Sequence, residues 1–82
     1  MARIFITGSA DGLGQLSACA LIEQGHKVVL HARNAARGRD AMKKNPQAEA
    51  VLTADLSNIE ETKNLAHEVN KHGIFDAVIH NA

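Results

Sequence analysis

The stretch from Thr7 to Gly14 contains the residue types best suited to bind a ligand. It reads Thr-Gly-Ser-Ala-Asp-Gly-Leu-Gly, with glycines at Gly8, Gly12 and Gly14. Glycine lets a backbone turn tightly and approach an anion closely, and the unpaired N–H groups at the start of a helix attract negative charge. No lysine follows the last glycine, so the pattern is not a P-loop. A flexible turn is the alternative, but flanking strand and helix patterns favour a phosphate-binding loop.

A second candidate site follows the next apolar run, about 20 residues after the glycines. In a dinucleotide-binding fold, this position contacts the adenosine ribose. An acidic residue there would bind a ribose 2′-hydroxyl and repel a 2′-phosphate, but residues 31–34 contain none. Arg33 instead offers a planar cation that suits a phosphate. The sequence therefore favours NADP over NAD as the cofactor, with a solvated surface arginine as the alternative.

The elements that must position these residues alternate along the chain. Apolar runs predict strands at Arg3–Ile6, Lys27–His31, Ala50–Thr53 and Phe75–His80. Helices are predicted at Leu13–Gln24, at Ala35–Lys44 with Asn34 as N-cap, and from a Ser57–Glu60 capping box to near Gly73. This alternation predicts an α/β fold, a doubly wound, Rossmann-type parallel sheet with strand order 3-2-1-4. Ligands bind such sheets at the carboxyl ends of the strands, where the glycine stretch also lies.

Composition argues against several other functions. The 82 residues carry no formal net charge, so neither nucleic acid nor a membrane surface is predicted as a partner. The single cysteine excludes an intrachain disulfide, and no apolar stretch reaches the roughly 18 residues of a membrane span. The first strand starts almost at Met1, which leaves no room for a signal peptide. These features predict a cytoplasmic protein.

His67 and His72 are five residues apart, which is not the i,i+4 spacing of a metal-binding pair on a helix, so no metal site is predicted.

Taken together, these motifs resemble the short-chain dehydrogenase/reductase family. The glycine stretch matches the family's T-G-x-x-x-G-x-G pattern. Ala32 and Arg33 match the small residue and arginine typical of NADP-preferring members, and Asp55-Leu56 matches the pair that borders the adenine. Asn81-Ala82 partly matches the family's N-N-A-G motif, with His80 in place of the first asparagine. The resemblance covers the whole chain but only the first half of a family domain.

The resemblance implies an oxidoreductase that transfers hydride between a nicotinamide cofactor and a small carbonyl or alcohol substrate. The family's proton donor is a tyrosine four residues before a lysine, in the second half of the domain, and this chain contains no tyrosine. Residues 1–82 are therefore expected to be a half-domain that ends after the fourth strand and is inactive alone. A nucleotide-sensing or regulatory module without hydride chemistry is the alternative.

The predicted site contains cofactor contacts and no catalytic or metal-binding residue. The expected cofactor contacts are Gly8, Ser9, Ala10, Asp11, Gly12, Leu13, Gly14, Ala32, Arg33, Asn34, Asp55, Leu56, Asn81 and Ala82. Because the fourth strand would present an apolar edge with unpaired backbone groups, we also expect association. The partner would be a second copy of the chain or the missing C-terminal half.

Overall fold

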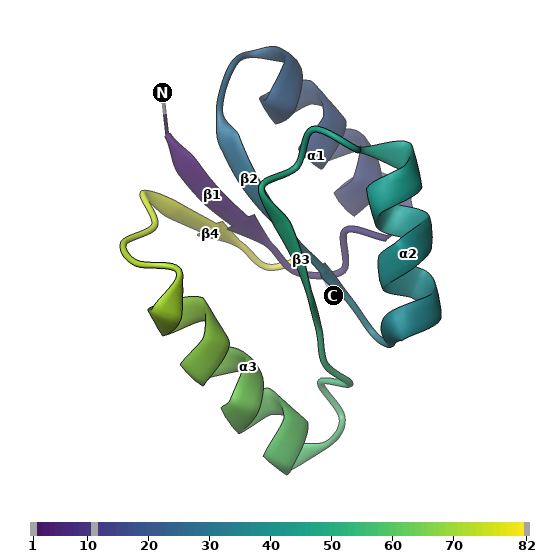
Figure 1. Cartoon of the computed structure of the whole chain (residues 1–82), viewed down its shortest axis with the longest axis vertical. Helices are drawn as coiled ribbons and strands as arrows, with labels where there is room; N and C mark the ends of the chain where they lie inside the picture. Colours follow the sequence, from purple (N-terminus) through teal and green to yellow (C-terminus); the bar gives the residue numbers. More distant parts are fainter. Residues whose placement is uncertain (1, 11, 82) are drawn as a thin grey trace.

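The computed structural model describes residues 2–10 and 12–81, and strands and helices alternate throughout them (Figure 1). The strands are β1 (Arg3–Ile6), β2 (Lys27–Ala32), β3 (Ala50–Thr53) and β4 (Ala77–Ile79). The helices are α1 (Gly12–Glu23), α2 (Ala35–Lys44) and α3 (Ile59–Lys71). The predicted α/β alternation is confirmed.

The four strands form one parallel sheet in the order β3-β2-β1-β4. Phe5, near the centre of the sheet, pairs with Val29 of β2 on one side and with Val78 of β4 on the other. The chain order reverses between β1 and β4, so the switch point lies beside the loop that follows β1. The predicted Rossmann-type topology and strand order are both confirmed.

The two faces of the sheet carry separate hydrophobic cores. Helices α1 and α2 cover one face and α3 covers the other (Figure 1). Ile4 and Ile6 face α1 and α2, whereas Phe5 and Val29 face α3 with Leu65. This division follows from the pleat, because successive side chains of a strand point to opposite faces. Helices cover both faces of the sheet near β1 and β2, so the apolar character of these strands correctly predicted that they are buried.

The start of α3 differs from the predicted capping box. Asn58, and not Ser57, is the N-cap: its side-chain oxygen accepts the Glu61 N–H at 3.1 Å. The Ser57 hydroxyl donates instead to the carboxylate of Asp55 at 2.7 Å. Serine and asparagine are both favourable N-cap residues, but Ser57 is hydrogen-bonded to the carboxylate of Asp55 two positions upstream. Asn58 therefore caps the helix. The prediction of Ser57 as the cap was wrong by one residue.

Strand β4 is shorter and more exposed than the other strands. The sequence predicted Phe75–His80, whereas the structure has Ala77–Ile79. Its side chains are accessible, with Val78 46% exposed and Ile79 37% exposed.

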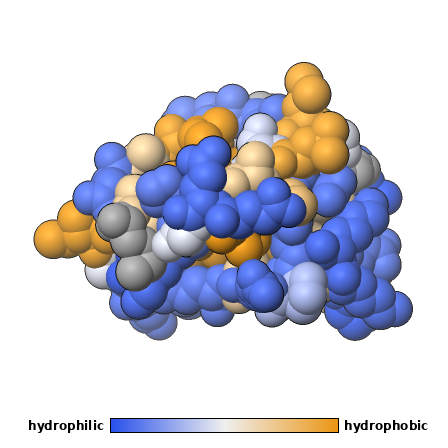
Figure 2. All heavy atoms as spheres, turned by 90° about the horizontal axis from the view of Figure 1, so that it is seen from above, coloured by the Kyte–Doolittle hydropathy of each residue, from blue (hydrophilic) through white to orange (hydrophobic). Residues whose placement is uncertain are grey.

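Seen from above, the surface is mostly hydrophilic with separate hydrophobic patches (Figure 2). Within the described residues, no helix combines the length and apolarity needed to cross a membrane.

Candidate functional site

The loop between β1 and α1 is shaped by glycine conformations that other residues rarely adopt. Gly8 has φ of 64° and Gly12 has φ of 61°. Apart from adjoining residues, no described atom lies within 4 Å of the position that a Cβ of Gly12 would occupy. Helix α1 begins at this open position. A side chain at this position would therefore point into open space beside the start of a helix, the part of a helix whose N–H groups can bind an anion.

Gly14 has a different role, because it lets α1 pack directly against the loop. A Cβ atom at Gly14 would overlap the carbonyl oxygen of Gly8 and the side-chain amide of Asn81. Only a residue without a side chain permits this contact. The last glycine of the stretch is therefore needed for helix packing, while Gly12 leaves room for a ligand.

On the side of β2, the loop is held by buried hydrogen bonds. The Ser9 N–H donates to the His31 carbonyl oxygen at 3.0 Å, and the His31 N–H donates to the Ser9 hydroxyl at 2.8 Å. The Gly8 N–H donates to the Nδ1 atom of His31 at 2.9 Å. Ser9 is fully buried and His31 is 3% exposed. The bonds between Ser9 and His31 are shielded from water, whereas the bond from Gly8 is partly buried. Together they fix the loop to β2.

On the side of β4, the loop is held by Thr7 and Asn81. The Thr7 N–H donates to the Ile79 carbonyl at 3.0 Å, and the Asn81 N–H donates to the Thr7 hydroxyl at 2.9 Å. The Asn81 side-chain amide donates to the Gly8 carbonyl at 3.2 Å. Asn81 is exposed. The end of β4 thus contributes to the shape of the loop from a solvent-accessible position.

A hollow of about 400 Å³ lies where the loops after β1, β2 and β3 meet. Its walls are Gly8, Ala10, His31, Ala32, Arg33, Asn34, Arg37, Ala54, Asp55, Leu56 and Ser57. The volume is within the range of ligand pockets. Three segments that are far apart in the sequence therefore form one site at the carboxyl edge of the sheet.

Opposite charges meet at the mouth of this hollow. The Nε atom of Arg33 lies 3.9 Å from a carboxylate oxygen of Asp55. Hydrogen bonds from the hydroxyl and the N–H of Ser57, and then the charge of Arg33, hold the pKa of Asp55 below its usual value. Asn34 accepts the Arg37 N–H at 2.9 Å and caps α2, as predicted. A cation and an anion are thus presented side by side to a ligand.

The structure brings half of the predicted contact residues to the wall of the hollow. These are Gly8, Ala10, Ala32, Arg33, Asn34, Asp55 and Leu56. Gly12, Gly14 and Asn81 shape the loop from outside that wall, and Leu13 is 75% exposed away from it. Ser9 is wholly buried, so its side chain supports the loop and does not face the hollow. Asp11 and Ala82 lie outside the described residues.

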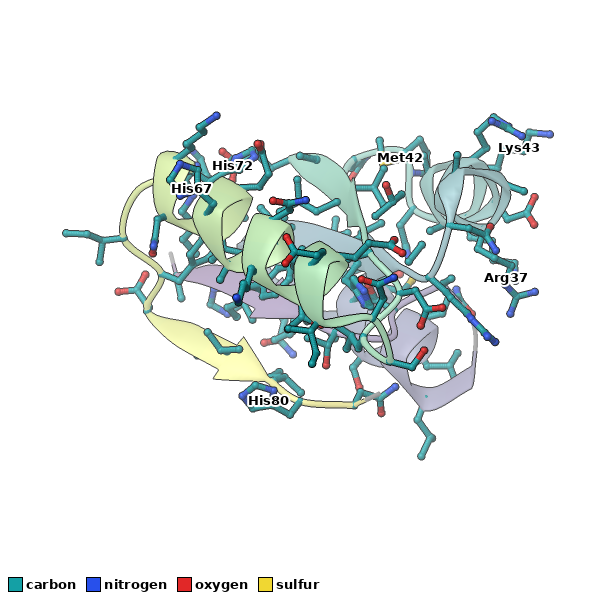
Figure 3. The ribbon with its side chains drawn as sticks, turned by 90° about the horizontal axis from the view of Figure 1, so that it is seen from below. Arg37, Met42, Lys43, His67, His72 and His80 are labelled. Carbon is teal, nitrogen blue, oxygen red and sulfur yellow. The ribbon has the colours of Figure 1, made fainter. Side chains whose placement is uncertain are left out.

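Sequence reasoning had missed the role of His31. The residue lies inside an otherwise apolar strand, and a buried polar side chain in such a strand needs partners. That signal was present in the sequence, but only the fold shows that the partners are Gly8 and Ala54. Three other histidines are spread out: Figure 3 shows His67 on α3, His72 directly after α3 and His80 directly after β4. Among the described residues, no group of three or more potential metal ligands occurs.

Comparison with known proteins shows which family the chain resembles. A sequence profile described as short chain dehydrogenase matches residues 2–82. An uncharacterized oxidoreductase of Emericella nidulans is 65% identical over all 82 residues, and a short-chain dehydrogenase of Gibberella zeae is 55% identical. Both alignments cover 100% of this chain and 32% of the relative, so the chain spans about a third of the length of these curated relatives.

Solved structures give the same result for the fold. The crystal structure of YwfH, an NADPH-dependent reductase involved in bacilysin biosynthesis, superimposes with a TM-score of 0.77 at 25% identity. The match covers 99% of this chain and 37% of that protein. The glycine loop, the strand order and the profile over nearly all residues agree, and the chain belongs to the short-chain dehydrogenase family.

Proposed function

We propose that this chain is the NADP(H)-binding part of a longer oxidoreductase that transfers hydride between the nicotinamide and a small carbonyl or alcohol substrate. The observation that carries the proposal is Arg33 at the mouth of a hollow whose floor includes Gly8 of the glycine loop. The names of the curated relatives support oxidoreductase chemistry over a purely nucleotide-sensing role. The NADPH dependence of YwfH supports the choice of cofactor.

The residues present suit each part of the cofactor. The open start of α1 at Gly12 can bind the pyrophosphate, because its N–H groups and helix dipole favour an anion. Arg33 can pair with the 2′-phosphate, and its side chain is 76% exposed and therefore accessible. Asp55 and Leu56 border the hollow where the adenine would lie. The cofactor would supply the hydride, and this chain would bind and orient it.

The proposal assigns the proton donor to residues outside this chain. Short-chain dehydrogenases use a tyrosine for that step, and residues 1–82 contain none. The curated relatives are about three times as long as the part that matches, which supports a second half that provides the donor and the substrate pocket. The class of substrate is proposed from the family, and its identity depends on that second half.

The test is the choice between NADP⁺ and NAD⁺ in the complete protein. Arg33→Ala should weaken NADP⁺ by about tenfold or more, because a charge-assisted bond to a phosphate contributes roughly 1.5–3 kcal/mol. NAD⁺ has no 2′-phosphate, so its affinity should change much less. Titration calorimetry or quenching of cofactor fluorescence gives both dissociation constants.

Arg39→Ala is the matched control, because Arg39 is an exposed arginine of α2 that does not line the hollow. It should leave both affinities close to those of the unsubstituted protein. Equal losses for NADP⁺ and NAD⁺ in Arg33→Ala would refute the specificity role. If the unsubstituted protein bound neither dinucleotide, the proposed function itself would be wrong.

A further inference from the structure

His31 connects two parts of the hollow that are distant in the sequence. Its Nδ1 atom accepts the Gly8 N–H at 2.9 Å, and its Nε2 atom lies 2.9 Å from the Ala54 carbonyl oxygen. Gly8 belongs to the glycine loop, and Ala54 directly precedes Asp55 at the opposite wall. The imidazole therefore spans the hollow's floor and links the loop after β1 to the loop after β3.

These two partners determine the protonation state of the ring. The Gly8 N–H can only donate, so Nδ1 must present a lone pair. The Ala54 carbonyl can only accept, so Nε2 must carry the hydrogen. A neutral imidazole with its hydrogen on Nε2 satisfies both partners. A protonated imidazole would point an N–H at another N–H, and the bond to Gly8 would be lost.

We infer that His31 is a positioning residue for dinucleotide binding, because its Nδ1 atom holds the Gly8 N–H of the glycine loop in place. The inference rests on the proposed function. Without an acceptor at the place of Nδ1, the partly buried bond to the Gly8 N–H is lost, and the loop loses one of its links to β2. The phosphate-binding geometry is then less well defined, so cofactor affinity falls.

The other groups around the ring have mixed charge. From β1, the edge of the Phe5 ring approaches at a centroid distance of 6.4 Å and is apolar. From the turn after β2 and from α2, Arg33 and Arg37 line the same hollow. From the loop after β3, Asp55 lines it, and Glu61 of α3 accepts the Asp55 N–H at 3.1 Å. The test therefore uses variants that keep these four charges and change only the imidazole.

Two substitutions separate the two bonds of the ring. The amide oxygen of His31→Asn can occupy the place of Nδ1 and accept the Gly8 N–H, without titrating. The amide of His31→Gln reaches the place of Nε2 and can donate to Ala54, but it leaves the Gly8 N–H unpaired. His67→Asn is the control, because His67 is an exposed histidine of α3 far from the hollow.

The experiment is NADP⁺ titration of the complete protein near neutral pH. The unsubstituted protein and His67→Asn should bind NADP⁺ with the same affinity. His31→Gln should bind about tenfold more weakly, because the Gly8 N–H loses its acceptor and the loop loses its link to the ring. His31→Asn should bind more tightly than His31→Gln, because its amide oxygen restores that acceptor.

A second readout needs no cofactor and no variant. In the protein without ligand, the ¹⁵N shifts of the His31 ring should report a protonated Nε2 and an unprotonated Nδ1 near neutral pH. The opposite tautomer, or an unchanged affinity in His31→Gln, would overturn the inference. If the unsubstituted protein bound no dinucleotide, the proposed function would fall with it, whereas a normal NADP⁺ affinity with insensitive His31 variants would overturn this inference alone.

Discussion

Strands β2 and β4 both pair with β1, yet they lie in very different environments. Phe5 of β1 has Val29 on one side and Val78 on the other, at equivalent positions of the register. Val29 is completely buried, whereas Val78 is 46% exposed. Valine is thus buried in a hydrophobic core on the β2 side and is partly exposed to solvent on the β4 side.

This difference extends to the glycine loop between the two strands. On the β2 side, the buried residues Ser9 and His31 hold it through hydrogen bonds. On the β4 side, the anchor is Asn81, which is exposed. The loop is therefore held by buried residues on the β2 side and by an accessible residue on the β4 side. The β4 side carries an open sheet edge, the kind of surface that pairs with further chain.

The largest expected effect comes from breaking the β4-side anchor at Gly14. Gly14→Ala would force a methyl group against the backbone carbonyl of Gly8 in the loop and against the side-chain amide of Asn81 after β4. Overpacking of this kind costs about 3 kcal/mol. We expect a loss of that size in the free energy of unfolding of the complete protein, with a matching loss of NADP⁺ affinity.

Chemical denaturation measures the first effect and cofactor titration the second. Ser17→Ala, at an exposed position of the same helix, is the control and should be nearly neutral. Gly12→Ala should cost less stability than Gly14→Ala, about 1–2 kcal/mol from its left-handed backbone conformation, because the surrounding space is open. A Gly14→Ala protein as stable as Ser17→Ala would disprove the packing role of this glycine.

The next prediction tests whether β2 and β4 still differ in burial in the complete protein. Val29→Ala removes two buried methyl groups and should cost about 2 kcal/mol. If further chain covers the face of β4 at Val78, as the length of the relatives suggests, Val78→Ala should cost a similar amount. A cost for Val78→Ala below about 0.5 kcal/mol would mean that this side chain remains exposed. Association of an isolated 82-residue chain through that edge stays a prediction.

The fold could be predicted because local patterns and chain order determine it. Apolar runs and helix caps gave most element boundaries to within one residue, and Asn34 was identified as a cap. Alternating elements with right-handed crossovers then left few possible topologies. The failures were local: Ser57 was replaced by Asn58 as the cap of α3, and β4 proved shorter at both ends. Neighbouring hydrogen bonds decide such details, and spacing does not encode them.

The site was predictable only where a motif fixes the backbone. The glycines and Arg33 occupy positions that a dinucleotide-binding pattern specifies, and the structure brings Gly8 and Arg33 to one hollow. The functions of Ser9 and His31 depend on contacts between residues 22 or more positions apart. A single sequence gives no register between β1 and β2, so these bonds could not be derived from it. Arg37, on the wall of the hollow, was not among the predicted contacts.

The smallest effect is expected from Asp55, at the polar mouth of the β2 side. Two hydrogen bonds from Ser57, followed by the charge of Arg33, lower the pKa of this carboxyl in the folded protein. Because the pKa of Asp55 is lower in the folded than in the unfolded protein, the ionised carboxyl stabilises the fold at pH values above its unfolded-state pKa. This stabilisation is lost as the pH falls through its folded-state pKa. Ser57→Ala removes the strongest of these bonds, so the pKa of Asp55 should rise toward 3.8, its ordinary value.

The measurement is an NMR titration of the Asp55 carboxyl in the complete protein, with Ser17→Ala as the control. Since this carboxylate is accessible, unfolding experiments should show only a slight loss of stability in mild acid, far below the loss expected for Gly14→Ala. Arg33→Ala should raise the same pKa by less than Ser57→Ala does, because the ion pair spans 3.9 Å and the hydroxyl bond 2.7 Å. A larger shift in Arg33→Ala would show that charge, and not hydrogen bonding, controls Asp55. Arg33, the residue proposed to bind the 2′-phosphate, would then control the pKa of Asp55. In that case NADP⁺ binding should itself raise the pKa of Asp55, because the phosphate would draw Arg33 away from the carboxylate.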